Sequence, residues 1–576
     1  MRKKLLLLGA FGMLTTATLC AQEFHLQPTP QEYITQKDSV DIPRQYQILS
    51  GNSVQDGPAL PLLRSLMPEE VLGASFRVYI GVKGDKIIKK YQHRIPRKSE
   101  GYFLKIEKDC IVIAGADERG AYYGVQTLAQ LLALDKLPLV EVTDYPDVPY
   151  RGVVEGFYGA PWSQEARIRQ LDFYGRNKMN VYIYGPKDDP YHRTPNWRKP
   201  YPAREGEELK VLVNRAKENN VIFYWAIHPG QDIRWNEEDR SLLLQKFESM
   251  YQLGVRGFAV FFDDISGEGT KADKQAELLN YIDDHFVKVK RDVAPLILCP
   301  TEYNKSWTDV EGGYLTTLGD KLNEGIKVMW TGDMVVATID KSTLDFVNPL
   351  LKRKAYIWWN FPVSDYVQDH LLLGPVYGNG LDIKDDMSAF VSNPMEHAEA
   401  SKISLYSVAD YTWNMENYDS ETSWKHAVRD LMPLHAEYLE IFAAHNSDPG
   451  QNGHRFRREE SVAIQPALSA LLKAYQEKNE IDEDAYRQVA EECRKIIVAA
   501  DGLLASGNEN RPLITEIRPW LIQFKQVGEY GAEVLNMIRL RQQKDAFIGS
   551  YEHARALLVL MGETDAQYKA GIKSGS

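Results

Sequence analysis

The sequence predicts an α/β fold organised around a (β/α)8 TIM barrel, with a small α/β domain before the barrel and an all-helical domain after it. Three observations lead to this prediction. From Arg151 to about Asn414, short apolar runs alternate with segments of helical spacing, and eight such units suit one parallel barrel. Strand-like alternation dominates the earlier part, and the pattern after about Leu431 is helical only. The predicted domains are therefore 22–146, 147–430 and 431–576.

Residues 1–21 match a secretory signal peptide. Basic residues at positions 2–4 precede an apolar run, and small residues lead to a cleavage point after Ala21. We therefore expect an exported protein, either periplasmic or secreted. Cys20 allows a lipoprotein as an alternative, ranked second because Leu19 is bulkier than such signals usually carry. Nothing else in the sequence is long and apolar enough to cross a bilayer, so no membrane contact is expected after cleavage.

Charge and cysteine content exclude several classes of function. The formal net charge is −12, and removal of the three basic signal residues would lower it to −15. Because neutralising phosphates needs a basic surface, we expect no nucleic-acid partner. After cleavage Cys110, Cys299 and Cys493 remain, too few and too widely spaced for a disulfide framework or a zinc site. We predict no metal and no cofactor.

The segment from 22 to about 146 is predicted to form the small α/β domain. Alternating apolar and polar residues predict strands at Ser75–Gly81 and Gly101–Glu107, and a third strand follows a tight turn at Cys110–Gly115. A stretch rich in Leu, Ala and Gln predicts a helix from Tyr122 to Leu132. No residue combination suited to catalysis occurs here, and the prolines of Tyr145–Pro149 mark the end of the domain.

Eight apolar runs supply the strands of the predicted barrel. They are Gly152–Gly159, Asn180–Lys187, Ile222–Pro229, Gly257–Asp264, Leu296–Tyr303, Lys327–Asp333, Ala355–Pro362 and Ala389–Pro394. Most are separated by segments of helical spacing, but the unit after the seventh strand is irregular, with a predicted loop at Gly374–Gly380. Beyond the barrel, apolar stripes predict a bundle with helices at Ser461–Tyr475, Asp484–Ala505 and Ile514–Leu540.

The carboxyl ends of the predicted strands carry polar residues, and barrels place functional residues at these ends. Reading them in order gives Gly156 and Tyr158, Lys187, Asp188 and Asp189, His228, Asp263 and Asp264, Glu302 and Tyr303, Thr331 and Asp333, Asn360, and Asn393. Trp330, Trp358 and Trp359 add aromatic faces suited to stacking on a sugar ring. Taken together, the strand ends indicate a carbohydrate site.

The apolar run that begins at Gly257 ends in two adjacent acids, Asp263 and Asp264. On a regular strand the two side chains would point to opposite faces, and one carboxylate would enter an apolar layer. We therefore expect the pair where the strand ends, with both carboxylates in one cleft. Paired acids in a partly dry cleft suit acid/base chemistry on a glycosidic bond. For an isolated Asp-Asp pair, a helix N-cap followed by a surface acid is the alternative.

Four motifs carry a resemblance to a known family: RGVVEGFYGAPW at 151–162, YGPKDDPY at 184–191, FFDD at 261–264 and WWNFPVSD at 358–365. They resemble glycoside hydrolase family 84, which comprises the O-GlcNAcases and related β-N-acetylglucosaminidases, and look closest to bacterial members of the Bacteroides type. The resemblance covers almost the whole chain after the signal and implies the same domain order. Bacterial members often continue past the helical domain, where this chain ends.

The resemblance implies retaining hydrolysis assisted by the substrate, whose 2-acetamido oxygen attacks the anomeric carbon to form an oxazoline. It implies that Asp263 orients and polarises the acetamido N–H, and that Asp264 is the general acid and then the general base. The expected partner is a glycan or glycoprotein that bears β-linked GlcNAc.

Further roles are implied by the same resemblance. The Gly156 backbone, Lys187, Asp365 and Asn393 match positions that hold sugar hydroxyls, and Asn360 and Tyr158 are expected at the sugar as well. The acetamide pocket and its wall are matched by Cys299, Tyr303, Thr331 and Trp358.

Several of these residues also have ordinary structural explanations. Asn393 could cap a helix, because Pro394 and Glu396 follow it at favourable positions. Lys187 could be a solvated surface lysine and Cys299 a core thiol. His228 is expected to be structural.

Two other functions stay open at this point. A conventional retaining or inverting glycosidase would use a distant pair of carboxylates such as Asp264 and Glu302. A catalytically idle carbohydrate-binding barrel is the alternative from another class, and the intact pair of adjacent acids counts against it.

Overall fold

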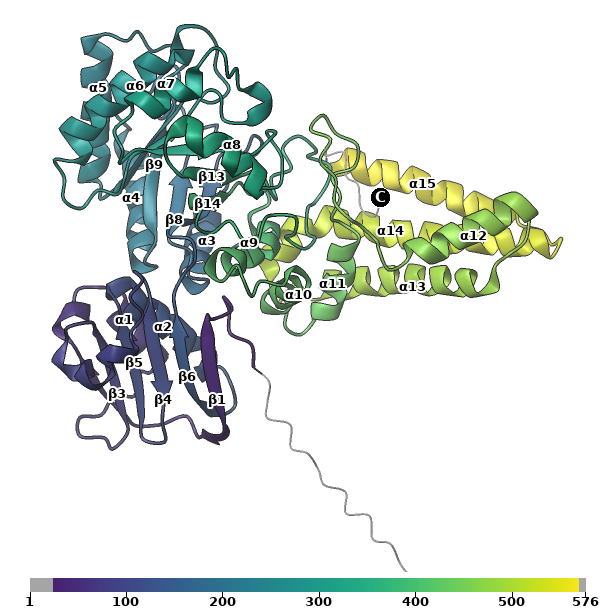
Figure 1. Cartoon of the computed structure of the whole chain (residues 1–576). Helices are drawn as coiled ribbons and strands as arrows, with labels where there is room; N and C mark the ends of the chain where they lie inside the picture. Colours follow the sequence, from purple (N-terminus) through teal and green to yellow (C-terminus); the bar gives the residue numbers. More distant parts are fainter. Residues whose placement is uncertain (1–23, 569–576) are drawn as a thin grey trace, which may run out of the picture.

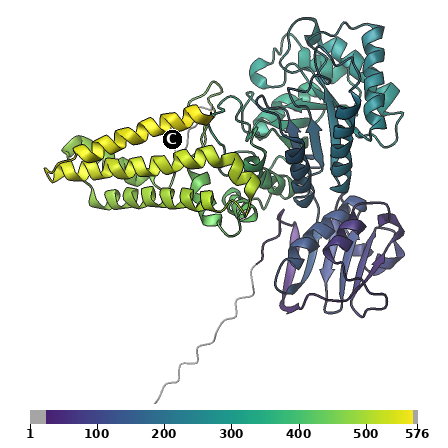
Figure 2. The ribbon, with the colours of Figure 1, turned by 180° about the vertical axis from the view of Figure 1, so that it is seen from behind.

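The computed structural model describes residues 24–568, which form three regions along the chain (Figure 1). An N-terminal α/β domain lies at one end of a closed barrel, and a group of long helices projects from the side of the barrel. The view from behind shows the same arrangement (Figure 2). The predicted fold class is confirmed, whereas the predicted signal peptide and Cys20 lie outside the described residues.

The N-terminal domain contains a six-stranded mixed sheet in the order β1-β6-β4-β5-β3-β2. Its strands are β1 (Glu32–Val40), β2 (Gln47–Ser50), β3 (Arg77–Val82), β4 (Tyr102–Ile106), β5 (Cys110–Gly115) and β6 (Leu137–Asp144). Helix α2 (Glu118–Leu132) packs on the sheet, and α1 (Ala59–Leu66) packs on α2. The three predicted strands and the predicted helix correspond to β3, β4, β5 and α2.

Eight parallel strands, β7 to β14 in ring order, close the barrel. They are β7 (Arg151–Glu155), β8 (Val181–Tyr184), β9 (Ile222–Ile227), β10 (Gly257–Phe261), β11 (Ile297–Cys299), β12 (Lys327–Trp330), β13 (Ala355–Trp359) and β14 (Met387–Ser392). The helices of this region are α3 (Gln164–Arg176), α4 (Ala203–Glu218), α5 (Glu237–Gln252), α6 (Ala272–Ile282), α7 (Tyr314–Lys321), α8 (Lys341–Leu351) and α9 (Ala398–Trp413). Residues 360–386, between β13 and β14, form a long loop, as the glycine-rich passage predicts.

The barrel strands are mostly apolar because both of their faces are buried, and the charged residues Arg151, Glu155 and Lys327 lie at strand ends. Side chains such as Trp225 and Phe258 pack under the helices, whereas Tyr224 and Ala259 fill the barrel interior. The predicted strand ends are wrong by two to four residues, since β10 stops at Phe261 and not at Asp264. The chain leaves the hydrogen-bonded ladder early at each carboxyl end. The polar residues assigned to strand ends therefore lie mostly in the loops that follow.

Up to residue 568, six helices follow the barrel. They are α10 (Ser420–Leu431), α11 (Ala436–Ala444), α12 (Gln465–Lys478), α13 (Glu483–Ala505), α14 (Arg511–Gln542) and α15 (Ile548–Tyr568). The long helix α14 packs against both α13 and α15, so apolar stripes on neighbouring helices bury one another (Figure 1). Over residues 24–568, no helix combines the length and the apolar character that crossing a membrane requires.

A fully buried ion pair joins the N-terminal domain to the barrel region. The Nζ atom of Lys178, beyond the end of α3, lies 3.2 Å from the Asp144 carboxylate at the end of β6. Tyr102 donates to the same carboxylate at 2.6 Å and accepts from Lys178 at 2.8 Å. The Trp413 indole N–H donates to the second oxygen of Asp144 at 2.7 Å. Both charges are therefore satisfied within the protein, as buried charges require.

The segment 445–464, between α11 and α12, returns to the barrel. The Arg458 guanidinium donates to the carbonyl oxygens of Pro375 and Tyr377 at 2.7 and 3.0 Å. It also lies 3.5 Å from the centre of the Tyr377 ring. These contacts fix the segment to the loop between β13 and β14, close to the carboxyl ends of the strands.

Candidate active site

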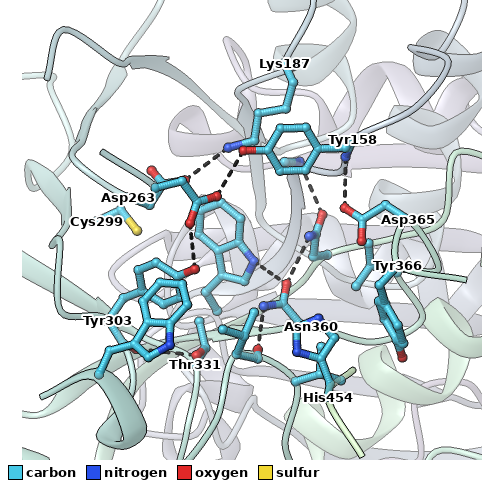
Figure 3. Close-up of a pocket in the computed structure, with 18 residues that line it drawn as sticks. Tyr158, Lys187, Asp263, Cys299, Tyr303, Thr331, Asn360, Asp365, Tyr366 and His454 are labelled. Carbon is cyan, nitrogen blue, oxygen red and sulfur yellow. Dashed lines mark hydrogen bonds and ion pairs between the residues drawn. The ribbon is translucent and has the colours of Figure 1, made fainter. Parts of the chain in front are cut away.

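A cavity of about 400 Å³ opens at the carboxyl ends of the barrel strands (Figure 3). The twelve residues that the sequence assigns to the site all line it: Gly156, Tyr158, Lys187, Asp263, Asp264, Cys299, Tyr303, Thr331, Trp358, Asn360, Asp365 and Asn393. They come from seven of the eight strands or the loops that follow them, and only the closed ring brings them together. A cavity of this size suits a small ligand.

The two adjacent acids both face the cavity, as their place at the strand end predicts. β10 ends at Phe261, and Asp264 adopts the left-handed backbone conformation with φ of 53°. This turn of the main chain ends the alternation of a strand, so consecutive side chains reach the same space. Asp263 is buried and Asp264 is exposed.

Asp263 is paired with a cation. Lys187 Nζ lies 3.0 Å from its carboxylate, and His228 Nε2–H donates to its backbone carbonyl at 2.8 Å. His228 Nε2 also lies 3.4 Å from the Asp263 carboxylate. Burial opposes ionisation of Asp263, but Lys187 and His228 outweigh it and hold the pKa of this carboxyl below its usual range. Asp263 is therefore a carboxylate at neutral pH, and His228 supports it.

Asp264 accepts hydrogen bonds from two tyrosine hydroxyls. Tyr158 donates at 3.0 Å and Tyr303 at 2.8 Å, one to each carboxylate oxygen. Burial, reinforced by the negative charge of Asp264, raises the pKa of both tyrosines, so both hydroxyls keep their protons. Among the described residues, no Lys, Arg or His lies within ion-pair distance of Asp264. The two neighbouring acids thus have different surroundings, a cation for one and neutral donors for the other.

Across the cavity from Asp263 lie Asp365 and Asn360 (Figure 3). Asp365 accepts the backbone N–H of Tyr158 at 2.9 Å, and burial raises the pKa of its carboxyl above the usual range. Asn393 accepts the backbone N–H of Gly156 at 3.3 Å and donates to the Asn360 side-chain oxygen at 3.0 Å. This network holds polar groups in fixed orientations at the edge of the cavity.

Trp358 forms an apolar wall beside these groups. A Cβ at position 156 would lie 2.5 Å from its ring, so the close approach of backbone and indole requires Gly156. The neighbouring Cys299 is buried, and burial raises the pKa of its thiol well above the usual range, so the thiol is neutral. Thr331 donates to the carbonyl of Met334 at 3.0 Å. Trp358, Cys299 and Thr331 are thus neutral themselves, and the Cys299 thiol lies beside the Asp263 carboxylate (Figure 3).

Six further lining residues were not predicted: Trp307, Val335, Val336, Val363, Tyr366 and His454. They lie in loops or, for Trp307, in the 3-10 turn Lys305–Trp307, where no periodic pattern marks them. His454 comes from the segment 445–464, which the sequence assigned to the helical domain, and its ring meets that of Tyr366 edge-on at 4.9 Å between centroids. Trp307 could have been found by extending the strand-end reading four residues past Tyr303.

Five polar residues at predicted strand ends lie outside the lining: Asp188, Asp189, His228, Glu302 and Asp333. Asp189 accepts hydrogen bonds from the hydroxyls of Tyr184 and Tyr201 at 3.0 and 2.7 Å, so it is a structural acid. Glu302 accepts the backbone N–H of Asp309 at 3.1 Å. A pair made of Asp264 and Glu302 is therefore not presented to the cavity.

Side chains grouped closely enough to hold a metal ion occur away from this cavity. Within residues 24–568, that grouping is Glu107, Asp109 and Cys110, at the turn between β4 and β5. The Cys110 thiol already donates to Glu107 at 3.4 Å, and burial raises its pKa to about 12, which disfavours a thiolate ligand. We assign no metal or cofactor to either place.

Three parts of the chain match known families. Residues 151–444 match the family described as beta-N-acetylglucosaminidase. Residues 460–576 match the bacterial GH84 post-catalytic domain, and residues 23–145 match domain 2 of glycosyl hydrolase family 20. The first match covers about half of the chain and contains every strand of the barrel.

Individual proteins are similar over different lengths. Protein O-GlcNAcase of Rattus norvegicus is 35% identical over 276 residues, which cover 46% of this chain and 30% of the relative. The chain thus spans less than a third of that relative. The solved structure of CpGH84B is 32% identical, with a TM-score of 0.87, and the match covers 95% of this chain and 97% of that one. An O-GlcNAc hydrolase variant of Thermobaculum terrenum is 26% identical, with a TM-score of 0.65 over 74% of this chain and 92% of that one.

Proposed function

This chain belongs to glycoside hydrolase family 84, and on that premise we propose that it is a β-N-acetylglucosaminidase of the O-GlcNAcase type. It removes terminal β-linked GlcNAc from a glycan or glycoprotein. The reaction retains the anomeric configuration and passes through an oxazoline that the substrate's own acetamido group forms. Similarity to the rat O-GlcNAcase and to the O-GlcNAc hydrolase of Thermobaculum terrenum supports this choice of substrate.

The difference between the two adjacent acids carries the proposal. Asp263 is kept ionised beside Lys187, so its carboxylate suits accepting the acetamido N–H and stabilising the positive charge of the forming ring. Asp264 is oriented by two neutral hydroxyls without a directly paired cation, so it suits a group that gives and takes a proton. One acid serves the ring substituent and the other serves the leaving oxygen.

Two steps complete the reaction. In the first, the acetamido oxygen attacks the anomeric carbon, and the bond to the leaving oxygen breaks as Asp264 gives that oxygen a proton. Asp263 holds the acetamido N–H during ring closure. In the second step, water attacks the anomeric carbon from the side that the leaving group vacated, and Asp264 takes the proton. The ring opens and the acetamido group is restored.

The remaining lining residues suit recognition of the sugar. The neutral Trp358 ring and Cys299 thiol suit contact with the acetamido methyl group, which gains from leaving water. Asp365 and Asn393 offer a carboxylate and an amide to sugar hydroxyls. Lys187, which pairs with Asp263, and Asn360, which accepts hydrogen bonds from Trp358 and Asn393, add further polar groups to the lining (Figure 3).

Paired aryl glycosides test the proposal. The aryl β-N-acetylglucosaminide is expected to turn over, whereas the aryl β-glucoside, which has only a 2-hydroxyl, is expected to be inert. Successive fluorination of the acetamido methyl should slow the reaction stepwise, because it weakens the carbonyl oxygen as a nucleophile. Comparable rates on the glucoside would favour the two-carboxylate mechanism, and binding without turnover of either substrate would favour an idle barrel.

We also propose that the protein is exported after cleavage following Ala21. Basic residues at positions 2–4, an apolar run and a small-residue end support this proposal. The mass of the mature N-terminus tests it, because a lipid on Cys20 would add mass that simple cleavage does not.

A further inference from the structure

Tyr158 occupies an exposed loop yet connects carboxylates on both sides of the cavity. The loop runs between β7 and α3, and Tyr158, Gly159 and Ala160 are all exposed. The Tyr158 hydroxyl donates to Asp264, while its backbone N–H donates to Asp365. A residue with so little burial needs other contacts to hold it in place.

Glu396 supplies such a contact from outside the cavity. It lies in the short segment between β14 and α9, and its carboxylate accepts the backbone N–H of Ala160 at 2.6 Å. A Cβ at position 159 would lie 2.6 Å from the same carboxylate oxygen, and Gly159 has φ of 130°, which L-residues rarely adopt. The carboxylate therefore packs directly against the loop, one and two residues after Tyr158.

Neither helix capping nor an ion pair explains the position of the Glu396 carboxylate. Helix α9 begins at Ala398 with His397 as its N-cap and no side-chain capping bond, so the alternative explanation of Asn393 as a helix cap does not hold. Within the described part of the chain, no Lys, Arg or His forms an ion pair with Glu396, although Arg169 pairs with the nearby Glu399. The half-buried Glu396 carboxylate thus accepts a hydrogen bond from the Ala160 backbone N–H, and hydrogen bonds to a carboxylate are strong.

The loop is also tied to the same segment at its far end. The Trp162 indole N–H donates to the carbonyl of Met395 at 3.2 Å. At its near end, Gly156 donates to Asn393. Glu396 therefore fixes the middle of a loop whose two ends are anchored independently.

We propose that Glu396 is a positioning residue that holds the Tyr158 hydroxyl against Asp264. It acts through the Ala160 amide and the packing on Gly159, and it touches no substrate. The inference rests on the proposed role of Asp264 as the acid and base. Without Glu396, the middle of the loop shifts, Asp264 loses one of its two orienting donors, and protonation of the leaving oxygen becomes less efficient.

Substitution of Glu396 tests whether its contact with the loop affects protonation of the leaving group by Asp264. For Glu396→Ala, kcat/KM on poor leaving groups should fall at least about tenfold, given that a 1 Å misplacement can cost about 10²-fold. Dinitrophenyl substrates, which leave without a proton, should be affected much less. Glu396→Gln keeps an acceptor for the Ala160 amide and should restore most of the lost rate.

A double-mutant cycle with Tyr158→Phe identifies the route. If Glu396 acts through the Tyr158 hydroxyl, the Tyr158→Phe/Glu396→Ala double variant should be no slower than Tyr158→Phe alone. Multiplicative losses would overturn the proposal, as would a Glu396→Ala loss equal for all leaving groups. Ser163→Ala is the matched control, because Ser163 caps α3 by accepting the Ala166 N–H at 3.1 Å. It should lower stability and leave the leaving-group dependence unchanged.

Amide hydrogen exchange gives a readout that needs no activity. In Glu396→Ala, but not in Ser163→Ala, exchange at Ala160 should accelerate. Unchanged protection would overturn the contact itself. A wild-type protein inert on every aryl N-acetylglucosaminide would instead reject the proposed function, and the exchange result would still stand.

Discussion

Two buried lysine–aspartate pairs lie at opposite ends of the barrel region and differ in how fully they are satisfied. At the junction with the N-terminal domain, Lys178 and Asp144 are 3.2 Å apart, and both have further hydrogen-bond partners. In the cavity, Lys187 and Asp263 are 3.0 Å apart, but one buried oxygen of Asp263 has only a long contact, 3.4 Å from His228 Nε2, and no hydrogen bond of good geometry among the described residues. The two ion pairs therefore have similar distances, but the Asp144 carboxylate is fully hydrogen-bonded and the Asp263 carboxylate is not.

The comparison distinguishes a structural pair from a pair that is ready for a ligand. A buried polar atom without a partner is costly, so its retention points to a group that binds later. The pKa values of the two lysines also shift in opposite directions. Burial lowers the pKa of Lys178 despite the attraction of Asp144. Burial also acts on Lys187, but the carboxylates of the cavity outweigh it and raise its pKa.

The largest expected effect comes from removing either acid of the cavity. Proton transfer by a positioned group contributes about 10²–10⁴-fold, so we expect a loss of that order for Asp264→Ala. Removing a preorganised group that stabilises developing charge costs about 10²–10³-fold, which is the loss expected for Asp263→Ala. Asp264→Ala should keep much of its rate on dinitrophenyl-type substrates, where azide is expected to rescue turnover, whereas Asp263→Ala should be slow with every leaving group. A series of aryl N-acetylglucosaminides measures this. The same leaving-group dependence in both variants would contradict the assigned roles.

Exchanging each lysine for methionine tests the comparison directly. Lys178→Met leaves Asp144 buried and unpaired, and the free energy of unfolding should fall by about 3–5 kcal/mol. Lys187→Met should lose less stability, because the open cavity admits water to Asp263, but it should lose most activity. Thermal unfolding and kcat/KM, measured on both variants, give the two readouts. Equal stability losses with equal activity would remove the distinction between the pairs.

Removal of Asp365 should have a smaller effect. A charged hydrogen bond contributes about 1.5–3 kcal/mol, so Asp365→Ala should lower kcat/KM by tens-fold or more and weaken sugar-like inhibitors. The fold should stay intact, because Asp365 lines the cavity and makes no ion pair among the described residues. Titration calorimetry with a neutral inhibitor measures the binding loss. Unchanged affinity would take Asp365 out of the sugar contacts.

The smallest effect concerns pH. The pKa of Asp365 is raised by burial, whereas that of Asp263 is lowered by Lys187 and His228. The carboxylate of Asp365 is present above its pKa and is lost as pH falls through it. Affinity for a neutral inhibitor should therefore decline on acidification before Asp263 protonates. In Asp365→Asn this decline should disappear, and an unchanged pH profile would assign it to another group.

The barrel and most of the site could be predicted because the apolar runs that mark the strands end at the polar residues that line the cavity. Strands buried on both faces leave apolar runs, and polar residues that interrupt such runs mark the carboxyl ends, as Lys187 and Asp263 do. The fold class and the family resemblance were confirmed. The role of each residue stays a prediction.

What the sequence did not predict depends on tertiary contact. Strand β1 is exposed along most of its length, so it has no apolar face to recognise, and it forms only by pairing with β6. The left-handed turn at Asp264 and the pairing of Glu396 with Ala160 follow from the folded loops, not from any periodic pattern. His454 lies far along the chain from the strands and joins them because contacts such as those of Arg458 and Glu459 with the loop at 375–377 anchor its segment.

That anchored segment limits how the chain could be recombined. A chimaera that took the barrel from this chain and the helices from a relative, joined at residue 430 or 444, would keep both acids of the cavity. It would import a foreign loop in place of His454 and the Arg458 contact with Tyr377. The part to exchange as a whole is therefore the barrel together with residues 445–464. We expect a chimaera to show the substrate preference of the protein that supplied this longer part.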